Sequence, residues 1–112
     1  MIDFTAAQKR ASPDHVVRNR RAMSLIRPFV PRFEDWNQRA AQASATALSK
    51  LASPAERDQQ IQILTMLRNE VENAYEEFEA AVAGEHQHSR IDDLRAAFLR
   101  LRHVLSRWQR GN

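Results

Sequence analysis

Residues 53–110 carry the pattern that decides the fold: SPAERDQQIQILTMLRNEVENAYEEFEAAVAGEHQHSRIDDLRAAFLRLRHVLSRWQR. Two runs of apolar residues in this stretch alternate by three and four positions, which is the spacing of one face of an α-helix. The runs are Leu64, Leu67, Val71, Ala74, Phe78 and Ala81, and then Ile91, Leu94, Phe98, Leu101, Leu105 and Trp108. The segment between them, at 84–89, is short and polar, so we expect the two helices to form an antiparallel hairpin.

Start and stop signals place the two hairpin helices at about 54–83 and 90–110. Ser53 stands before a proline at the first helical position, and Glu56 three residues later completes a capping box. Ser89 with Asp92 predicts a second capping box at the start of the last helix. Gly84 is expected to end the first hairpin helix in the left-handed conformation that glycine tolerates.

Two further helices are expected upstream, at about 13–28 and 32–51. Ser12 precedes a proline, as a helix N-cap residue can, and Pro28 and Pro31 are expected to kink or break the chain between the two helices. We expect Phe29 and Phe33, beside these prolines, to pack as an elbow. The apolar stripes are Val16, Ala22, Met23 and Ile26 in the first helix, and Phe33, Trp36, Ala40, Ala43, Ala47, Leu48 and Leu51 in the second.

The composition supports a helical protein of one domain. Glycine occurs twice and proline four times in 112 residues, which leaves little of the turn chemistry that an all-β domain needs. We therefore predict an all-α fold, a small antiparallel bundle of three to four helices built on the long hairpin. The domain is expected to span 1–112, with 1–11 forming either a short helix or a flexible arm.

Several classes of function lack the residues they need. The chain has no cysteine, which excludes disulfides, thiolate metal sites, a cysteine nucleophile and covalent c-type haem attachment. It also has no phosphate-binding glycine loop, dinucleotide fingerprint or nucleophile elbow, so we expect no catalytic site, no cofactor and no small-molecule substrate. No apolar stretch has the length of a signal-peptide core or a membrane span, and we expect a cytoplasmic protein.

The acidic residues of the first hairpin helix raise the question of a metal site. They are Glu70, Glu72, Glu76, Glu77 and Glu79. A di-metal site in a helical bundle needs Glu-x-x-His motifs on two helices, whereas the only such spacing here runs from Glu85 to His88, in the turn. Glu85, His86 and His88 also fall short of the four fixed ligands of structural zinc. We therefore expect no metal site.

The net charge of +3 conceals a basic, acidic, basic order along the chain. Basic and acidic residues number seven and three in 1–34, four and eight in 35–83, and six and three in 84–112. The candidates for phosphate contacts are Arg18, Arg20, Arg21, Arg100 and Arg107. They carry the alternative function, a small nucleic-acid-binding regulatory protein. No helix-turn-helix spacing supports this alternative, and the same charges suit pairing between helices.

A helical wheel divides the side chains of the last helix into groups. Arg95 and Arg102 lie at the edge of the apolar stripe, where they can pair with acids of another helix, whereas Arg100 and Arg107 lie on the outer face. The stripe on this wheel also includes Val104. Leu99 points outward, where a solvated face would carry a polar residue, which favours a partner surface.

The expected function is therefore that of a non-catalytic protein–protein interaction module, such as an adaptor, regulator, inhibitor or chaperone-like protein. We expect it to form a homodimer, or to bind another protein, through helix faces. The candidate contact residues are Tyr75, Arg95, Leu99 and Arg102, while Trp36 and Trp108 are expected to be core anchors. The helix at 54–83 spans about 45 Å, more than its neighbours, so a monomer is expected to leave part of its apolar stripe uncovered.

Overall fold

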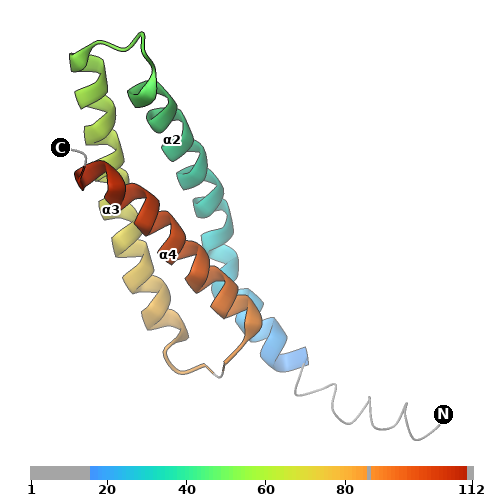
Figure 1. Cartoon of the computed structure of the whole chain (residues 1–112). Coiled ribbons are helices and arrows are strands. Elements are labelled where there is room, and N and C mark those ends of the chain that lie inside the picture. The colour runs from blue at the N-terminus through green and yellow to red at the C-terminus, as the bar shows by residue number, and fades with distance from the viewer. Residues whose placement is uncertain (1–15, 86, 111–112) are drawn as a thin grey trace, which may run out of the picture.

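The computed structural model describes residues 16–85 and 87–110, which form helices joined by two turns. A helical segment at 16–26 is followed by the 3-10 turn η1 (Arg27–Phe29) and the helices α2 (Val30–Leu48), α3 (Pro54–Val82) and α4 (Ser89–Arg110). Figure 1 shows α2 and α4 running in the same direction and α3 running opposite to both. The predicted all-α antiparallel bundle is confirmed. The predictions for 1–11 and for a start at Ser12 lie outside the described residues.

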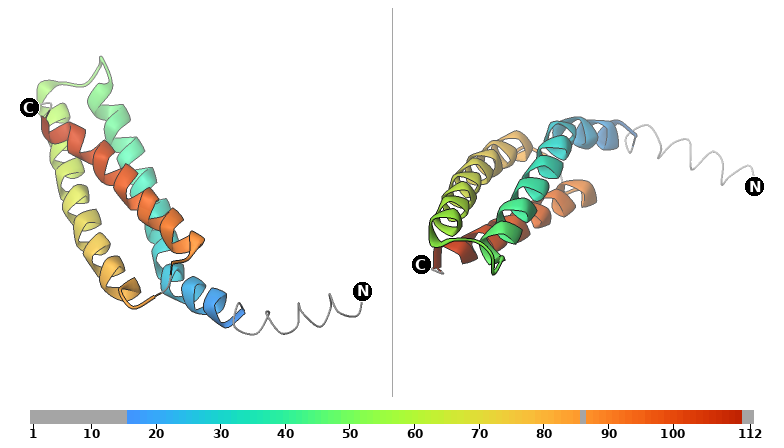
Figure 2. Two further views of the ribbon diagram at one scale, coloured as in Figure 1. Left: turned by 60° about the horizontal axis from the view of Figure 1, so that its bottom comes forward. Right: turned by 90° about the horizontal axis from the view of Figure 1, so that it is seen from above.

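The two prolines do not break the chain. The residues that flank η1 on both sides have right-handed helical φ and ψ angles. The segment 16–26 therefore continues through η1 into α2 as one helical run (Figure 2). Pro28 and Pro31 each lie in the first two positions of their element, at the 3-10 turn where the α-helical hydrogen-bond pattern changes. Of the predicted kink or break, the structure shows no break, only the 3-10 turn η1 between two α-helical segments, and Phe29 and Phe33 are buried beside the prolines as expected.

The apolar stripes of the helices meet in one core, which among the described residues includes no buried polar or charged side chain. The stripe of α3 is buried from Leu64 to Phe78 as predicted, but its last member is Val82, because Ala81 is exposed. In α4, Ile91, Phe98, Leu101 and Leu105 are buried. Partly buried side chains that pack against this core include Leu94 and Trp108.

One chain covers the apolar stripe of α3, so the prediction that a monomer leaves part of it open was wrong. The residues of the stripe from Leu64 to Val82 are at most 5% exposed. The first six residues of α3, Pro54–Gln59, are exposed, and they carry no apolar stripe. The part of α3 that needs cover is therefore shorter than the helix, and α2 and α4 are long enough to supply it.

Besides Ala81, four residues assigned to apolar stripes from the sequence are exposed: Val16, Leu48, Leu51 and Val104. Leu48 is 72% exposed because it is the last residue of α2, and Leu51 is 95% exposed because it lies in the turn that follows. The second helix therefore ends three residues before the predicted end. Val104, at 45% exposed, lies at the edge of the α4 stripe rather than in its centre.

The ring of Phe98, at the centre of the core, contacts aromatic rings from three other elements. Ring centres of Phe33 and Trp36 on α2 lie 4.6 and 5.8 Å away, and those of Tyr75 and Phe78 on α3 lie 5.4 and 5.3 Å away. The ring of Phe29, in η1, lies 5.9 Å away. Most of these pairs are edge-to-face, a favourable arrangement of ring quadrupoles.

Two of the three predicted helix-end signals were wrong. The Oγ of Ser53 accepts a hydrogen bond from the backbone N–H of Glu56 at 3.1 Å, as the predicted cap of α3 requires. At α4, Ser89 is already helical, and the cap is the preceding His88, whose Nδ1 accepts from the N–H of Arg90 at 3.1 Å. Gly84 does not have a positive φ, because α3 has already ended at Val82 without a left-handed residue.

Replacing Phe98 with alanine is expected to lower the free energy of unfolding by about 3–5 kcal/mol, because a fully buried ring and its aromatic contacts are lost. Chemical denaturation followed by circular dichroism measures this change. The matched control is Leu99→Ala at the next position, which is 46% exposed and should cost at most about 1 kcal/mol. Equal losses for the two variants would contradict the aromatic core.

Replacing Gly84 with alanine is expected to raise the free energy of unfolding by about 0.5 kcal/mol. A Cβ added at this position meets no heavy atom within 4 Å, and the backbone does not need glycine there. The gain comes from the lower conformational entropy of the unfolded chain. Thermal and chemical denaturation test this expectation, and a loss of about 1 kcal/mol or more would instead indicate a left-handed residue.

Candidate functional site

Four glutamates of α3 connect it to both neighbouring helices through ion pairs. Toward α2, Glu70 lies 3.0 Å from Arg39, and Glu77 lies 3.2 Å from Arg32. Arg39 also binds Asp35, one turn before it, at 3.2 Å. Glu70 and Glu77 are seven residues apart, so they project from the same side of α3 and join it to α2 over about 10 Å.

Toward α4, a second pair of glutamates projects from the other side of α3. Glu72 accepts two hydrogen bonds from Arg102, at 2.8 and 3.2 Å, in a two-pronged arrangement. One carboxylate oxygen of Glu79 accepts from Nε and Nη2 of Arg95, at 3.0 and 2.9 Å. In the part of the chain that the structure describes, no three acidic or histidine side chains are grouped to hold a metal ion.

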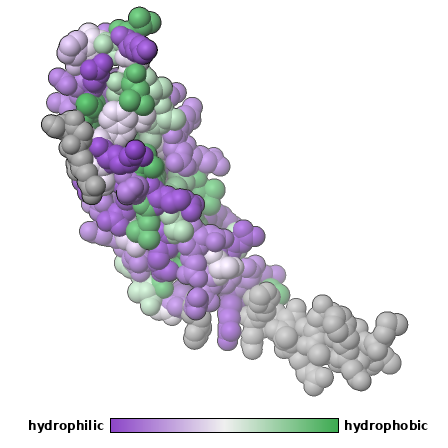
Figure 3. Space-filling model, in the orientation of Figure 1, coloured by the Kyte–Doolittle hydropathy of each residue, from purple (hydrophilic) through white to green (hydrophobic). Residues whose placement is uncertain are grey.

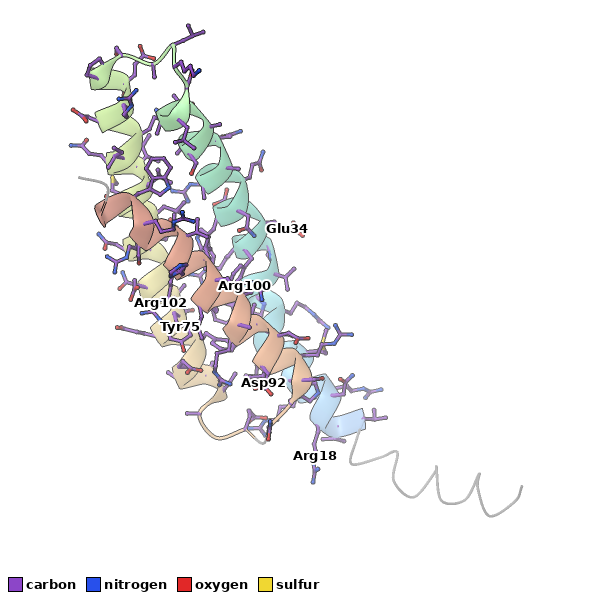
Figure 4. The ribbon with its side chains drawn as sticks, in the orientation of Figure 1. Arg18, Glu34, Tyr75, Asp92, Arg100 and Arg102 are labelled. Carbon is purple, nitrogen blue, oxygen red and sulfur yellow. The ribbon has the colours of Figure 1, made fainter. Side chains whose placement is uncertain are left out.

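We call the ion pairs of Glu72 and Glu79 with Arg102 and Arg95 the α3–α4 junction. Three of the four residues predicted to contact a partner lie in this junction. The Tyr75 hydroxyl donates to Glu79 at 3.2 Å, and the guanidinium carbon of Arg102 lies 4.9 Å from the centre of the Tyr75 ring (Figure 4). Tyr75, Arg95 and Arg102 thus use their polar groups within the chain. The fourth, Leu99, is exposed as predicted and lies one turn from both arginines, on the side of α4 that faces α3.

The junction shifts the proton affinity of two of its groups. Burial raises the pKa of the Tyr75 phenol above 10.0, and the negative charge of Glu79 raises that pKa further. The hydrogen bond to Glu79 also raises the pKa of the Arg95 guanidinium. Both shifts favour the protonated donors that the junction uses, so its hydrogen bonds persist across the neutral pH range.

The five arginines proposed for phosphate contacts do not form one continuous surface. Arg21 is occupied by Glu85, with Nε 2.8 Å from the carboxylate. Arg18 lies beside the start of α4, where it lines a small pocket with His88. Arg100 comes twelve residues after His88, which is about 18 Å along the helix. All five candidate arginines are exposed: Arg18, Arg20, Arg21, Arg100 and Arg107.

A groove lies between α2 and α4 on the surface of the described residues. Both α2 and α4 pack closely on α3, but the backbones of α2 and α4 come close to each other at very few positions. The groove between them has a volume of about 350 Å³. Its lining residues include Asn37, Ala41 and Ser44 from α2 and Ala97, Leu101 and Val104 from α4. Figure 3 shows apolar patches on the face viewed in Figure 1, set among hydrophilic side chains.

The residues of the groove follow a sequence pattern that the core stripes concealed. On α2 the lining positions 37, 41 and 44 are separated by four and three residues, and on α4 the lining positions 97, 101 and 104 repeat the same intervals. Each set is therefore a second face of its helix, next to the core face. A helical wheel of α2 that marks small residues would have revealed this second face, because the small residues Ala41 and Ser44 lie on it beside polar residues.

No protein family model, curated protein or solved structure matches this chain. None of the helices in the described residues combines the length and apolar composition that crossing a membrane requires. The function is therefore argued from the groove and the charges around it.

The pKa of Tyr75 provides a direct test of the junction, because this is the only tyrosine of the chain. Titration of the tyrosinate absorbance is expected to give a midpoint above 10.0, and Glu79→Gln should lower this midpoint. Since the pKa is raised on folding, the stability it contributes is fully present below pH 10.0 and is lost as the pH rises through the folded-state pKa. A midpoint unchanged by Glu79→Gln would contradict the Tyr75–Glu79 contact.

Proposed function

We propose that this protein is a non-catalytic protein–protein interaction module that binds a helix of a partner in the groove between α2 and α4. The observation that carries the proposal is the incomplete contact between these two helices, which leaves an open groove with an apolar floor. Two helices that flank an apolar groove are a common docking site for an amphipathic helix. A docked helix would complete a four-helix arrangement.

The exposed apolar side chains beside the groove support this role. Val104 lines the groove and is 45% exposed, and Leu48 continues the groove-facing positions of α2. Apolar surface that is covered on binding contributes about 25 cal/mol per Å² of free energy. The small residues Ala41, Ser44 and Ala97 also allow the backbone of a second helix to approach closely.

A partner of a different sequence fits these observations better than a homodimer. The argument for self-association was an uncovered stripe on α3, and the chain itself covers that stripe. In a symmetric dimer that places the two α4 helices antiparallel across the groove, the exposed Arg100 side chains of the two copies would face each other, and like charges oppose association. We expect the module to act in the cytoplasm, since a chain without cysteine needs no oxidising compartment.

The nucleic-acid alternative has less support from the described surface. Arg21 is paired with Glu85, and the other four candidate arginines are divided between the helical segment at 16–26 and the second half of α4. A continuous basic surface, which phosphate binding favours, is not built from these residues. Binding to duplex or single-stranded nucleic acid with a steep salt dependence would nevertheless favour this alternative over the proposal.

The test is a selection of helical peptides against the whole protein. A display library of amphipathic peptides about 22 residues long, randomised at its apolar and flanking positions, is expected to yield binders. Ala41→Trp fills the groove from its exposed rim and should weaken these binders by about tenfold or more. Fluorescence titration of the selected peptides measures the change, and amide shifts in NMR spectra locate the binding site.

The matched control is Ala81→Trp, which adds the same side chain at an exposed position of α3. This variant should bind the selected peptides like the wild type. No enriched peptides, or peptides whose affinity is the same for Ala41→Trp and Ala81→Trp, would refute the proposed function. Circular dichroism of both variants verifies that each remains folded.

A further inference from the structure

We propose that the helix bound in this groove carries acidic side chains in its N-terminal half and a basic side chain near its C-terminal end, and that it lies antiparallel to α2 and α4. This inference rests on the proposed function, because it specifies the chemistry and direction of the partner in the same groove. It combines three observations. Arg100 and Arg107 on α4 have no acidic partner among the described residues, the acidic residues Asp93 and Glu34 lie toward the opposite end of the groove, and the two flanking helices run parallel.

Arg100 and Arg107 present positive charge along the α4 rim of the groove. Arg100 lines the groove, and Arg107 lies two turns further on the same outer face of α4. Neither has an acidic partner within 4 Å among residues 16–85 and 87–110, whereas Arg95 and Arg102 on the same helix are both paired. Their spacing of seven residues, about 10 Å, matches two carboxylates seven residues apart on an opposing helix.

The opposite end of the groove carries negative charge. Asp93 is exposed and lies seven residues before Arg100 on α4, and Glu34 is exposed one turn before Asn37 on α2. No basic side chain of the described residues lies within 4 Å of either carboxylate. The rim of the groove therefore changes from acidic near Asp93 to basic near Arg107, and a bound helix must carry the reverse order of charges.

The direction of the bound helix follows from the helix dipoles. α2 and α4 run parallel, so their negative C-terminal ends lie at the same end of the groove, near Arg107 (Figure 1). A helix that runs antiparallel brings its positive N-terminus to that end. Acidic residues in the first turns and basic residues in the last turns also stabilise the bound helix itself. The dipoles and the side-chain charges thus favour the same partner and the same direction.

A second copy of this chain does not supply such a helix among its described elements. In α3 five of the seven acidic residues lie in the C-terminal half, which is the opposite of the required order, and four of these five already bind α2 and α4. In α4 the positions 93, 100 and 107 are Asp, Arg and Arg, so its middle position carries a basic residue where the proposed partner carries an acid, and an antiparallel second copy would place Arg100 opposite Arg100. The partner is therefore a different chain with an amphipathic segment of this charge order.

Two synthetic helical peptides provide the test, with identical apolar positions and three flanking positions seven residues apart. One peptide carries Glu, Glu and Lys at these positions in chain order, and the other carries Lys, Lys and Glu. Both are titrated against the whole protein at low and moderate salt. The Glu-Glu-Lys peptide should bind at least about tenfold more tightly, and added salt should reduce the difference.

Charge-reversed protein variants identify the residues responsible. Arg100→Glu combined with Arg107→Glu should invert the preference between the two peptides. The control, Arg18→Glu combined with Arg20→Glu, makes the same change in net charge outside the groove and should preserve the preference. A spin label on the peptide N-terminus should broaden the amide signals of α4 near Arg107 rather than those near Asp93.

The outcomes separate this inference from the proposed function. If both peptides bind equally, and Ala41→Trp weakens both, the groove binds helices but the proposed partner chemistry is wrong. If the spin label broadens signals near Asp93, the proposed direction is wrong. If Ala41→Trp weakens the binding of no peptide, whether one of these two or one selected from the library, the proposed function itself is wrong.

Discussion

The contact of the Phe98 ring with rings from α2, α3 and η1 determines how the helices are spaced. Phe33 and Trp36, in the first two turns of α2, meet Phe98, and such large rings hold α2 and α4 apart. In the following turns the α2 residues that line the groove are small, namely Ala40, Ala41 and Ser44. Small side chains cannot fill the separation that the aromatic rings impose. The groove is therefore a consequence of how the core is packed.

The same packing leaves α3 as the only helix that contacts both others closely along its length, and its charges are arranged accordingly. Ion pairs at the rim of a core contribute little free energy individually, because water screens them. Their larger effect is on register, since glutamates at intervals of seven residues match arginines at the same interval on each neighbour. Arg100, which takes no part in this arrangement, lines the groove, and Arg107 lies seven residues later on the same outer face of α4.

Much of the fold follows from sequence periodicity, because a core stripe needs only apolar side chains at helical spacing, and Leu64, Val71 and Phe98 satisfy that condition. The errors occurred where geometry beyond periodicity decides. Val104 fits the wheel, yet no helix lies over it, and Gly84 was assigned a conformation that the chain does not need once α3 has ended. The groove was not predicted because it depends on the distance between two helices, and that distance is set by rings far apart in sequence.

The two rows of glutamates on α3 have a further consequence, for the handedness of the bundle. Three helices joined by short turns can place the third helix on either side of the first two, and a purely apolar core distinguishes poorly between these two topologies. Here Glu70 and Glu77 on one flank of α3 match arginines of α2, while Glu72 and Glu79 on the other flank match arginines of α4. In the opposite topology each flank would face the wrong neighbour. The charged rim therefore selects one of two nearly equivalent mirror arrangements.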